Sequence, residues 1–155
     1  MEESVSRVPQ RAATGLREMI QSAFPKKEVD IRTYSPLTLA YIGDAIYDLI
    51  IRTVVVSEAN RPANALHHYT VRYVSAGAQA RIVEALQDTL TEEEQSVYRR
   101  GKNSKPHTTA KNATAADYMK ATGFEAVLGY LYLKDDLERV LELVQTGIRL
   151  AGMTI

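Results

Sequence analysis

Two carboxylates stand in unusually apolar stretches of the 155-residue sequence. Asp44 lies in LAYIGDAIYDL (39–49), next to Gly43, and Glu125 is the only charged residue of ATGFEAVLGYLYL (121–133). Burial can raise the pKa of a carboxylate by about 3–5 units, so two such sites would cost about 8–14 kcal/mol. A cation, a hydrogen-bond donor or a cleft should offset this cost. A divalent metal fits, because Mg²⁺ accepts one or two carboxylates and keeps several waters.

Simpler interpretations of these acidic residues remain open. A Glu in an apolar helix often pairs with a buried Arg or caps a neighbouring helix. Asp48 follows Asp44 by four residues and can share its helix face. It would then lie either beside a metal ligand or at the solvent edge of the helix, and we favour the solvent edge.

Charge is segregated along the chain, although 19 Lys+Arg balance 19 Asp+Glu. Residues 99–112 carry five basic and no acidic residues, whereas residues 84–94 carry five acidic and no basic ones. A uniformly basic nucleic-acid binder is therefore excluded, but a local basic surface is not. The non-periodic segment GKNSKPHTTAKNA (101–113) is predicted to be an exposed loop, either functional or simply solvated.

The elements that must position these residues are predicted to be helices. Ser35-Pro36 is typical of a helix start, and Thr91 to Glu94 forms a capping box. Apolar residues recur too densely from Leu37 to Val56 for one stripe, which predicts a central, mostly buried helix. No convincing period-2 strand occurs, so the predicted class is all-α with six or seven helices. Their expected ranges are 14–24, 37–56, 63–74, 75–90, 91–101 and 114–133, with a last helix from Asp135 or Asp136 to about Leu150.

Composition narrows the class further. The chain has no cysteine, which excludes a disulfide scaffold, a thiolate zinc site and a cysteine nucleophile. The first residues (MEESVSRVPQ) contain no apolar core of a secretory signal. The most apolar stretch carries Asp44, Asp48 and Arg52, so no membrane span is expected. We therefore expect a cytoplasmic protein that binds no membrane.

Both acidic stretches resemble signatures of the ribonuclease III family. YIGDAIYDL matches the signature helix, with Gly43-Asp44 on the family's Gly-Asp, and FEAVLGYLYL matches the second signature, with Glu125 on its essential Glu. SAGAQARI, EEEQSVYRRGKNSK and TTAKNAT look like the middle of the compact Mini-ribonuclease III form, which lacks a double-stranded-RNA-binding domain. We expect a catalytic domain at 34–152 after an N-terminal extension, 1–33, of unassigned role.

This resemblance implies a ribonuclease III-like helical bundle that forms a homodimer. It would cleave double-stranded RNA with Mg²⁺ or Mn²⁺, leaving 5′-phosphate and 3′-hydroxyl ends. Asp44 and Glu125 would be the metal ligands and the catalytic residues. Leu37, Ala40 and Thr122 stand where full-length members carry acids, a reduction that the Mini form shares. With few protein ligands, metal affinity without substrate should be weak.

RNA binding is expected in the basic region, because duplex RNA presents phosphates and 2′-hydroxyls rather than readable bases. The expected RNA-binding residues are Arg99, Arg100, Lys102, Lys105, His107, Thr108, Lys111 and Asn112. The resemblance also suggests the 23S ribosomal RNA precursor as substrate. A ribosomal protein is a candidate partner, and neither the residues nor the resemblance identifies it. Exposed apolar residues on 37–56 and around Tyr130 are candidates for the dimer surface.

Two competing functions keep the same helical class. One is a non-cleaving RNA-binding or ribosome-assembly protein, against which the intact Asp44 and Glu125 argue. The other is a protein–protein adaptor that docks through its acidic segment, 84–94.

Overall fold

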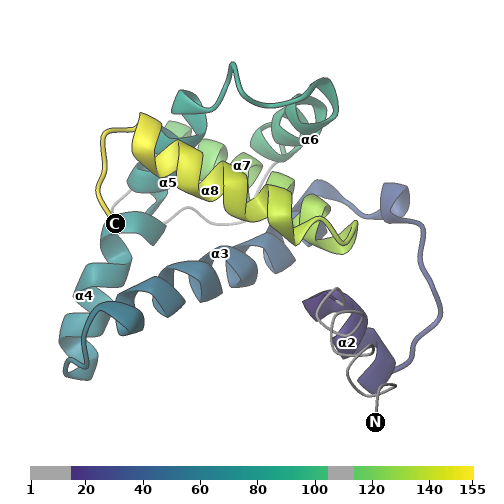
Figure 1. Ribbon diagram of the computed structural model, residues 1–155. Helices are drawn as coiled ribbons and strands as arrows, with labels where there is room; N and C mark the ends of the chain where they lie inside the picture. Colours follow the sequence, from purple (N-terminus) through teal and green to yellow (C-terminus); the bar gives the residue numbers. More distant parts are fainter. Residues whose placement is uncertain (1–14, 105–113) are drawn as a thin grey trace, which may run out of the picture.

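The computed structural model describes residues 15–104 and 114–155, and within these ranges the chain is helical, without a strand (Figure 1). The all-α prediction is confirmed, because seven α-helices and one 3₁₀ turn form these parts. They are α2 (Leu16–Ala23), η1 (Ile31–Thr33), α3 (Pro36–Glu58), α4 (Ala63–Val74), α5 (Ala76–Ala85), α6 (Glu92–Lys102), α7 (Ala115–Leu133) and α8 (Leu137–Leu150).

Two predicted helix starts are confirmed at the level of single hydrogen bonds. Ser35 Oγ accepts a bond of 3.2 Å from the Thr38 backbone N–H, with Pro36 in the first turn. The Thr91 side chain accepts from the backbone of Glu94 (3.1 Å), and the Glu94 carboxylate accepts from the backbone of Thr91 (2.9 Å). These bonds satisfy backbone N–H groups that have no partner inside a helix.

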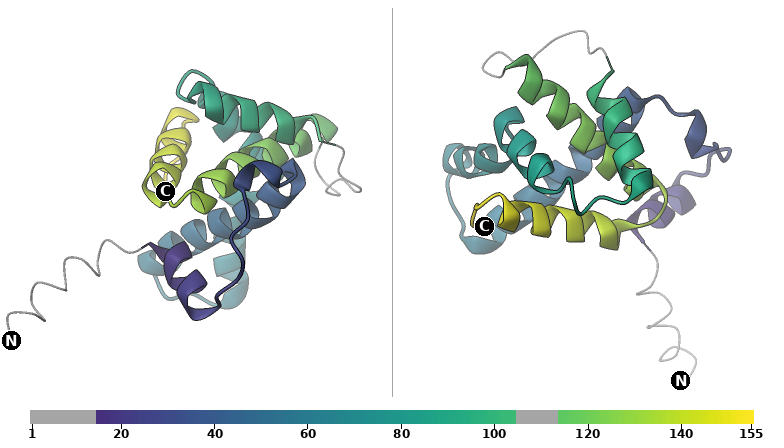
Figure 2. Two further views of the ribbon diagram at one scale, coloured as in Figure 1. Left: turned by 90° about the vertical axis from the view of Figure 1, so that its right-hand side faces the viewer. Right: turned by 90° about the horizontal axis from the view of Figure 1, so that it is seen from above.

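Helix α7 lies at the centre of the fold and contacts α3, α5, α6 and α8. In the side view of Figure 2 it lies between α3 and α6. Phe124, Val127 and Leu128 of α7 are fully buried. Tyr47 of α3 meets Phe124 edge to face, with ring centroids 5.6 Å apart. Since α7 meets four helices, its apolar residues are needed on nearly every side.

The prediction of a mostly buried 37–56 helix is wrong for one face of α3. Leu39, Ile46 and Ile51 are buried, but Tyr41 is 81% exposed and Leu49 is 52% exposed. Leu37 and Val56 are exposed on the same face. A dense apolar pattern indicates burial, but it cannot tell whether the covering surface belongs to the same chain or to another one.

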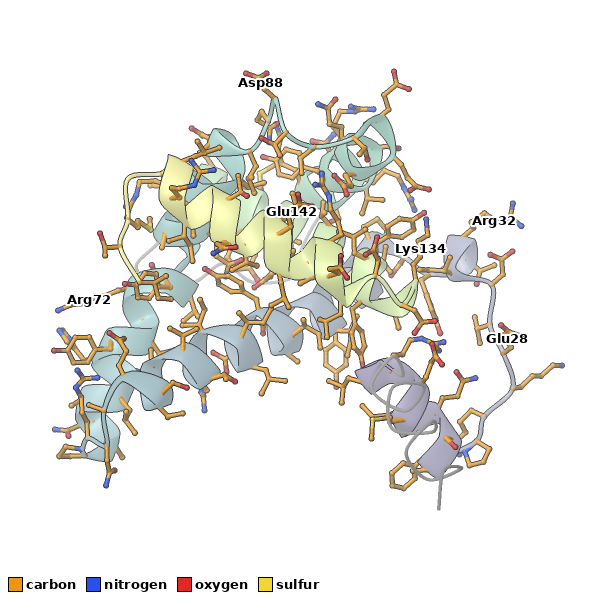
Figure 3. The ribbon with its side chains drawn as sticks, viewed as in Figure 1. Glu28, Arg32, Arg72, Asp88, Lys134 and Glu142 are labelled. Atoms are coloured by element: carbon orange, nitrogen blue, oxygen red, sulfur yellow. The ribbon has the colours of Figure 1, made fainter. Side chains whose placement is uncertain are left out.

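The helix predicted at 75–90 ends earlier, at Ala85, and residues 86–90 form turns. Leu86 and Leu90 are nevertheless buried, as their helical spacing predicted. The polar run Gln87-Asp88-Thr89 follows the last helical turn, and Asp88 lies at the outer tip of the connection to α6 (Figure 3).

Most acidic residues of segment 84–94 form ion pairs or hydrogen bonds with other residues of the same chain. Glu84 forms an ion pair with Lys120, and Glu93 accepts hydrogen bonds from Tyr130 (2.7 Å) and Lys134 (3.2 Å). Glu94 is only 3% exposed. These internal bonds leave few free charges for the docking face that the adaptor hypothesis requires.

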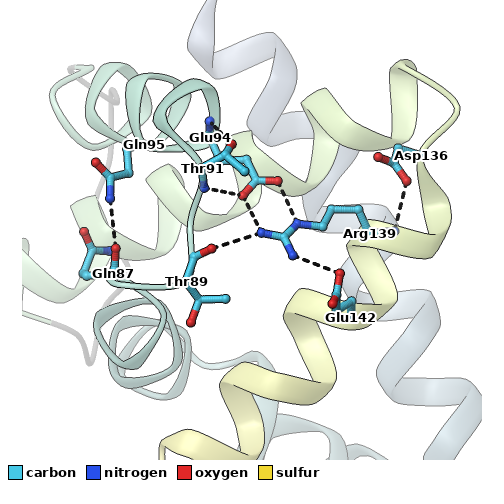
Figure 4. A network of polar contacts seen from close by, with 8 residues as sticks. All are labelled: Gln87, Thr89, Thr91, Glu94, Gln95, Asp136, Arg139 and Glu142. Atoms are coloured by element: carbon cyan, nitrogen blue, oxygen red, sulfur yellow. Dashed lines mark hydrogen bonds and ion pairs between the residues drawn. The ribbon is translucent and has the colours of Figure 1, made fainter.

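Arg139 of α8 neutralises the buried Glu94 (Figure 4). Its Nε and Nη2 each donate to one carboxylate oxygen at 2.9 Å, and Nη2 also donates to the Thr89 carbonyl at 3.1 Å. Burial alone would raise the pKa of Glu94, but the bonds from Arg139 and from the Thr91 N–H bring that pKa below its ordinary value. The pair therefore ties α8 to the start of α6.

We expect Arg139→Met to lower the free energy of unfolding by about 3–5 kcal/mol at pH 7, because it leaves a buried carboxylate without a cation. Urea unfolding measures the loss. The deficit should shrink as the pH approaches the ordinary pKa of a glutamic acid, 4.5, since protonation then removes the unpaired charge. Glu142→Gln is the control: Glu142 accepts from the same Arg139 at 2.9 Å but is exposed, so about 1 kcal/mol or less should be lost. Equal losses in both variants would contradict the prediction.

Helix α2 belongs to the expected N-terminal extension and has no buried residue. Arg17 joins it to the rest of the chain through a forked pair with Asp135, with N···O distances of 2.6 and 2.7 Å. The boundary between residues 33 and 34 stays a prediction. Among the described residues, no helix combines the length and the hydropathy that a bilayer crossing requires.

Candidate active site

The backbones of α3 and α7 touch at two glycines. A methyl group added to Gly43 would overlap the carbonyl oxygen of Glu125 and lie 2.8 Å from the backbone nitrogen of Gly129. A methyl group at Gly129 would in turn overlap the Leu39 carbonyl oxygen. Only glycine allows this approach, which brings the residue after Gly43 next to the Glu125 side chain.

Asp44 and Glu125 therefore lie side by side, although they are far apart in the sequence. Glu125 is half-buried, and burial raises its pKa to about 8, with the Asp44 charge and a hydrogen bond with Asp44 adding to the rise. A bond from Gln79 acts in the opposite direction. No basic side chain is among these influences in the described part of the chain. The metal-free site therefore holds its proton to a higher pH than an ordinary glutamate does.

The expectation that both carboxylates are surrounded by apolar residues is wrong for Asp44, which is exposed. The reason is the uncovered face of α3, on which Tyr41 and Ala45 are exposed as well. The large burial cost thus falls mainly on Glu125. Asp48, one turn further on, pairs with Arg52 at 2.7 Å, in agreement with a place at the solvent edge.

Gln79 of α5 completes the immediate surroundings of the pair. It is 2% exposed and donates from Nε2 to Glu125 Oε2 at 3.2 Å. The same nitrogen donates to the Val74 carbonyl at 3.0 Å. Three helices, α3, α5 and α7, thus supply the groups at this site.

The donor set fits a hydrated divalent cation rather than a fully enclosed metal. Two carboxylates are what Mg²⁺ usually takes from a protein, the remainder being water and substrate phosphate. No group of three or more His, Cys, Asp or Glu capable of holding a metal is found among residues 15–104 and 114–155. The buried Gln79 Oε1 accepts no hydrogen bond from any described residue, which leaves an acceptor free beside the pair. The roles of Asp44 and Glu125 in metal binding and catalysis stay predictions.

The basic residues that the structure describes lie at the end of α6. Arg99 and Arg100 are exposed, and the Lys102 ammonium lies 5.9 Å from the centre of the Tyr98 ring. A methyl group at Gly101 would lie 2.9 Å from the Ala126 Cβ, so this end of α6 packs on the α7 segment that carries Glu125. The other expected RNA-binding residues lie outside the described residues: Lys105, His107, Thr108, Lys111 and Asn112.

Known proteins are similar to this chain in sequence and in fold. The sequence model of the Ribonuclease III domain matches residues 37–136, which include Asp44, Glu125 and most of the helices around them. The chain belongs to the ribonuclease III family. It is therefore an endoribonuclease of the ribonuclease III type.

Relatives within the ribonuclease III family agree with the compact form. The chain is 48% identical over 119 residues to a Mini-ribonuclease 3 of Thermoanaerobacter sp. (strain X514), covering 77% of this chain and 84% of the relative. It is 46% identical over 127 residues to a Mini-ribonuclease 3 of Enterococcus faecalis, covering 81% and 96%. The resemblance to Mini-ribonuclease III is thereby confirmed.

A solved structure also shares this ribonuclease III fold. A crystal structure of a Fusobacterium nucleatum protein superimposes with a TM-score of 0.71 at 33% identity, covering 79% of this chain and 98% of that one.

Gln79 is the residue of this candidate site that sequence analysis missed. Its signal was weak: a single amide two residues before Arg81 in a helical segment, which is equally typical of the polar edge of a helix. The contact of Gln79 with Glu125 depends on how α5 packs on α7, and no local sequence pattern predicts that packing.

Proposed function

We propose that this chain is a divalent-metal-dependent endoribonuclease that cleaves double-stranded RNA to 5′-phosphate and 3′-hydroxyl ends. The observation that carries the proposal is the pair Asp44 and Glu125: two carboxylates from separate helices meet without a described basic side chain to neutralise them. An uncompensated carboxylate pair is costly unless a cation joins it. Family membership supports hydrolysis of RNA at this pair.

Asp44 and Glu125 would hold the cation, either Mg²⁺ or Mn²⁺, since carboxylate oxygens suit both ions. When bound, the cation would polarise a water molecule and a backbone phosphate for reaction with each other. Glu125 must give up its proton to act as a ligand, and its raised pKa makes this step depend on pH. The exposed Asp44 keeps the pair open to an incoming phosphate backbone.

The end of α6 would contact the RNA backbone. Arg99 and Arg100 are exposed there, close to the α7 segment of Glu125. Guanidinium groups recognise phosphates by forked hydrogen bonds and need no particular base, which suits a duplex. Lys102 and the five candidates from 105 to 112 would extend this surface.

A homodimer would cover the exposed apolar face of α3, formed by Leu37, Tyr41, Leu49 and Val56. A second copy is the natural partner for such a face, because a two-fold interface pairs a surface with itself. Two protomers would then bring one site to each strand of a duplex. Tyr130 is a weaker candidate for this interface, since it is half-buried and donates to Glu93 within the chain.

The resemblance favours the 23S ribosomal RNA precursor as the substrate. Maturation of ribosomal RNA would place the protein in the cytoplasm, with a ribosomal protein as a partner. The competing function of a non-cleaving RNA-binding protein disagrees with membership of the ribonuclease III family and with the kinship to Mini-ribonuclease 3.

The test is incubation with a long, fully paired RNA in the presence and absence of Mg²⁺, followed by mapping of the product ends. We expect double-strand cuts only with Mg²⁺ and only 5′-phosphate and 3′-hydroxyl ends. Binding of the duplex without cleavage at any Mg²⁺ concentration would contradict the proposed specificity for double-stranded RNA. Cyclic phosphate ends, or cleavage in a chelator, would contradict a metal site at these carboxylates.

Arg99→Ala combined with Arg100→Ala should weaken duplex binding and reduce its salt dependence. Two lost phosphate contacts lower the slope of log K against log salt by about 1.5. A filter-binding titration at several salt concentrations measures this slope. Arg149→Ala removes an exposed arginine of α8 instead and should leave the slope unchanged. A wild-type slope in the double variant would show that these two arginines do not contact the RNA phosphates.

A further inference from the structure

The side chain of Gln79 is held between a helix end and the candidate metal site. The residue is 2% exposed, and its Nε2 donates to the Val74 carbonyl at 3.0 Å and to Glu125 Oε2 at 3.2 Å. Val74 is the last residue of α4, so its carbonyl lies where a helix has no backbone partner to offer. One amide group thus links the end of α4 to Glu125.

The orientation of this amide follows from its neighbours. Both groups that face Nε2 are oxygens, so a flipped amide would place its own oxygen against two acceptors. Ser75, which lies between α4 and α5, accepts a hydrogen bond from the Ala78 backbone and thereby holds the corner that leads to Gln79. The side chain therefore has one favourable arrangement.

The other end of the amide shows that packing alone does not account for this residue. Gln79 Oε1 is buried and accepts no hydrogen bond from any described residue. A buried acceptor without a partner costs free energy, whereas an apolar side chain of similar size would fill the same space without that cost. The amide thus combines two donor bonds, to the end of α4 and to Glu125, with an acceptor that no described residue uses, and filling space does not require this combination.

We propose that Gln79 is a positioning residue for Glu125. Its N–H bond holds Oε2 of the carboxylate, so that the second oxygen is the one left for a divalent cation, and its free Oε1 is an acceptor for water at the same site. The inference rests on the proposed function, because it assigns Gln79 to the metal site of that reaction. Residues that orient metal ligands typically change affinity or activity by about 10-fold to 100-fold when they are replaced.

The test compares Gln79→Met and Gln79→Leu with wild type. Both replace the amide by an apolar side chain of similar size, so both remove the donor and the free acceptor without adding a charge to the site. Mn²⁺ alone is titrated calorimetrically into the RNA-free protein at pH 8, and kcat and KM are measured on an RNA duplex with Mg²⁺. We expect Mn²⁺ affinity and kcat to fall about 10-fold or more in both variants, with KM for RNA unchanged and kcat partly restored by higher Mg²⁺.

Gln87→Met is the matched control, because Gln87 also donates from Nε2 to a backbone carbonyl, that of Val83 at 2.9 Å. It should leave Mn²⁺ affinity and kcat unchanged. Wild-type Mn²⁺ affinity and kcat in either folded Gln79 variant would overturn the role of Gln79 while leaving the proposed function intact. A wild-type protein that neither binds Mn²⁺ nor cleaves duplex RNA would overturn both.

Discussion

Glu125→Gln is expected to reduce cleavage of duplex RNA by about 10³-fold or more, and Asp44→Asn should do the same. A metal ion supplies several kcal/mol of charge stabilisation in the transition state, and about 4 kcal/mol corresponds to a factor of 10³ in rate. Both changes keep the size of the side chain and remove one anionic ligand. Single-turnover cleavage of a labelled duplex measures the loss, and the Kd for RNA in Ca²⁺ or EDTA should change little.

The same Glu125→Gln change is expected to stabilise the metal-free protein at pH 8. The folded-state pKa of Glu125 is raised to about 8, above its ordinary value of 4.5, so the folded protein binds the proton more tightly. The wild type should therefore be most stable below about pH 4.5 with respect to this group, and lose a few kcal/mol as the pH rises toward 8. The variant lacks the group, so this part of the pH dependence should disappear.

Urea unfolding in EDTA at pH 5 and pH 8 measures this gain in stability, which is opposite in sign to the loss of cleavage. Glu58→Gln is the control: it removes an exposed glutamate at the end of α3 and should affect neither cleavage nor the pH dependence of stability. A Glu125→Gln protein that still cleaves within tenfold of the wild-type rate would show that Glu125 is not a catalytic residue.

Gly43→Ala should cost about 3 kcal/mol or more of unfolding free energy and abolish cleavage. The added methyl group overlaps the Glu125 carbonyl oxygen, which belongs to a helix backbone and cannot rotate away. The helices α3 and α7 must then separate, and overpacking of this kind is costly. Because Asp44 and Glu125 depend on that contact, their joint site would be lost with it. Thermal unfolding and the duplex assay measure the two effects.

Gly77→Ala separates this steric effect from the general effect of replacing a helical glycine. The nearest atom to a methyl group at Gly77 is Asp117 Oδ2 at 3.7 Å, an ordinary contact. Alanine is favoured over glycine within a helix by about 0.5–1 kcal/mol, so Gly77→Ala should be neutral or stabilising and fully active. If Gly43→Ala proved equally well tolerated, the close approach of α3 and α7 would not be needed for the site.

The local sequence was sufficient to predict the helix starts, because there the deciding contacts are made between residues close in the sequence. Ser35 caps α3 through the residue three positions on, and Thr91 and Glu94 bond to each other across one turn. It was harder to predict which of the two apolar segments forms the fully surrounded central helix. Both 37–56 and 121–133 are rich in apolar residues, but α7 is surrounded by four helices, whereas α3 keeps one face exposed. Composition indicates how apolar a helix is, but it does not indicate which neighbouring helix or chain covers its apolar face.

The amino-acid sequence by itself determined the helical class, the helix starts, the kinship with ribonuclease III and the identity of the two candidate carboxylates. Only the tertiary structure decided that Asp44 is exposed while Glu125 is half-buried, and that Gln79 donates to Glu125. The physical reason is distance along the chain. Helix periodicity and capping act within a few residues. The meeting of α3, α5 and α7 depends on backbone contacts at Gly43 and Gly129, between residues that no local pattern connects.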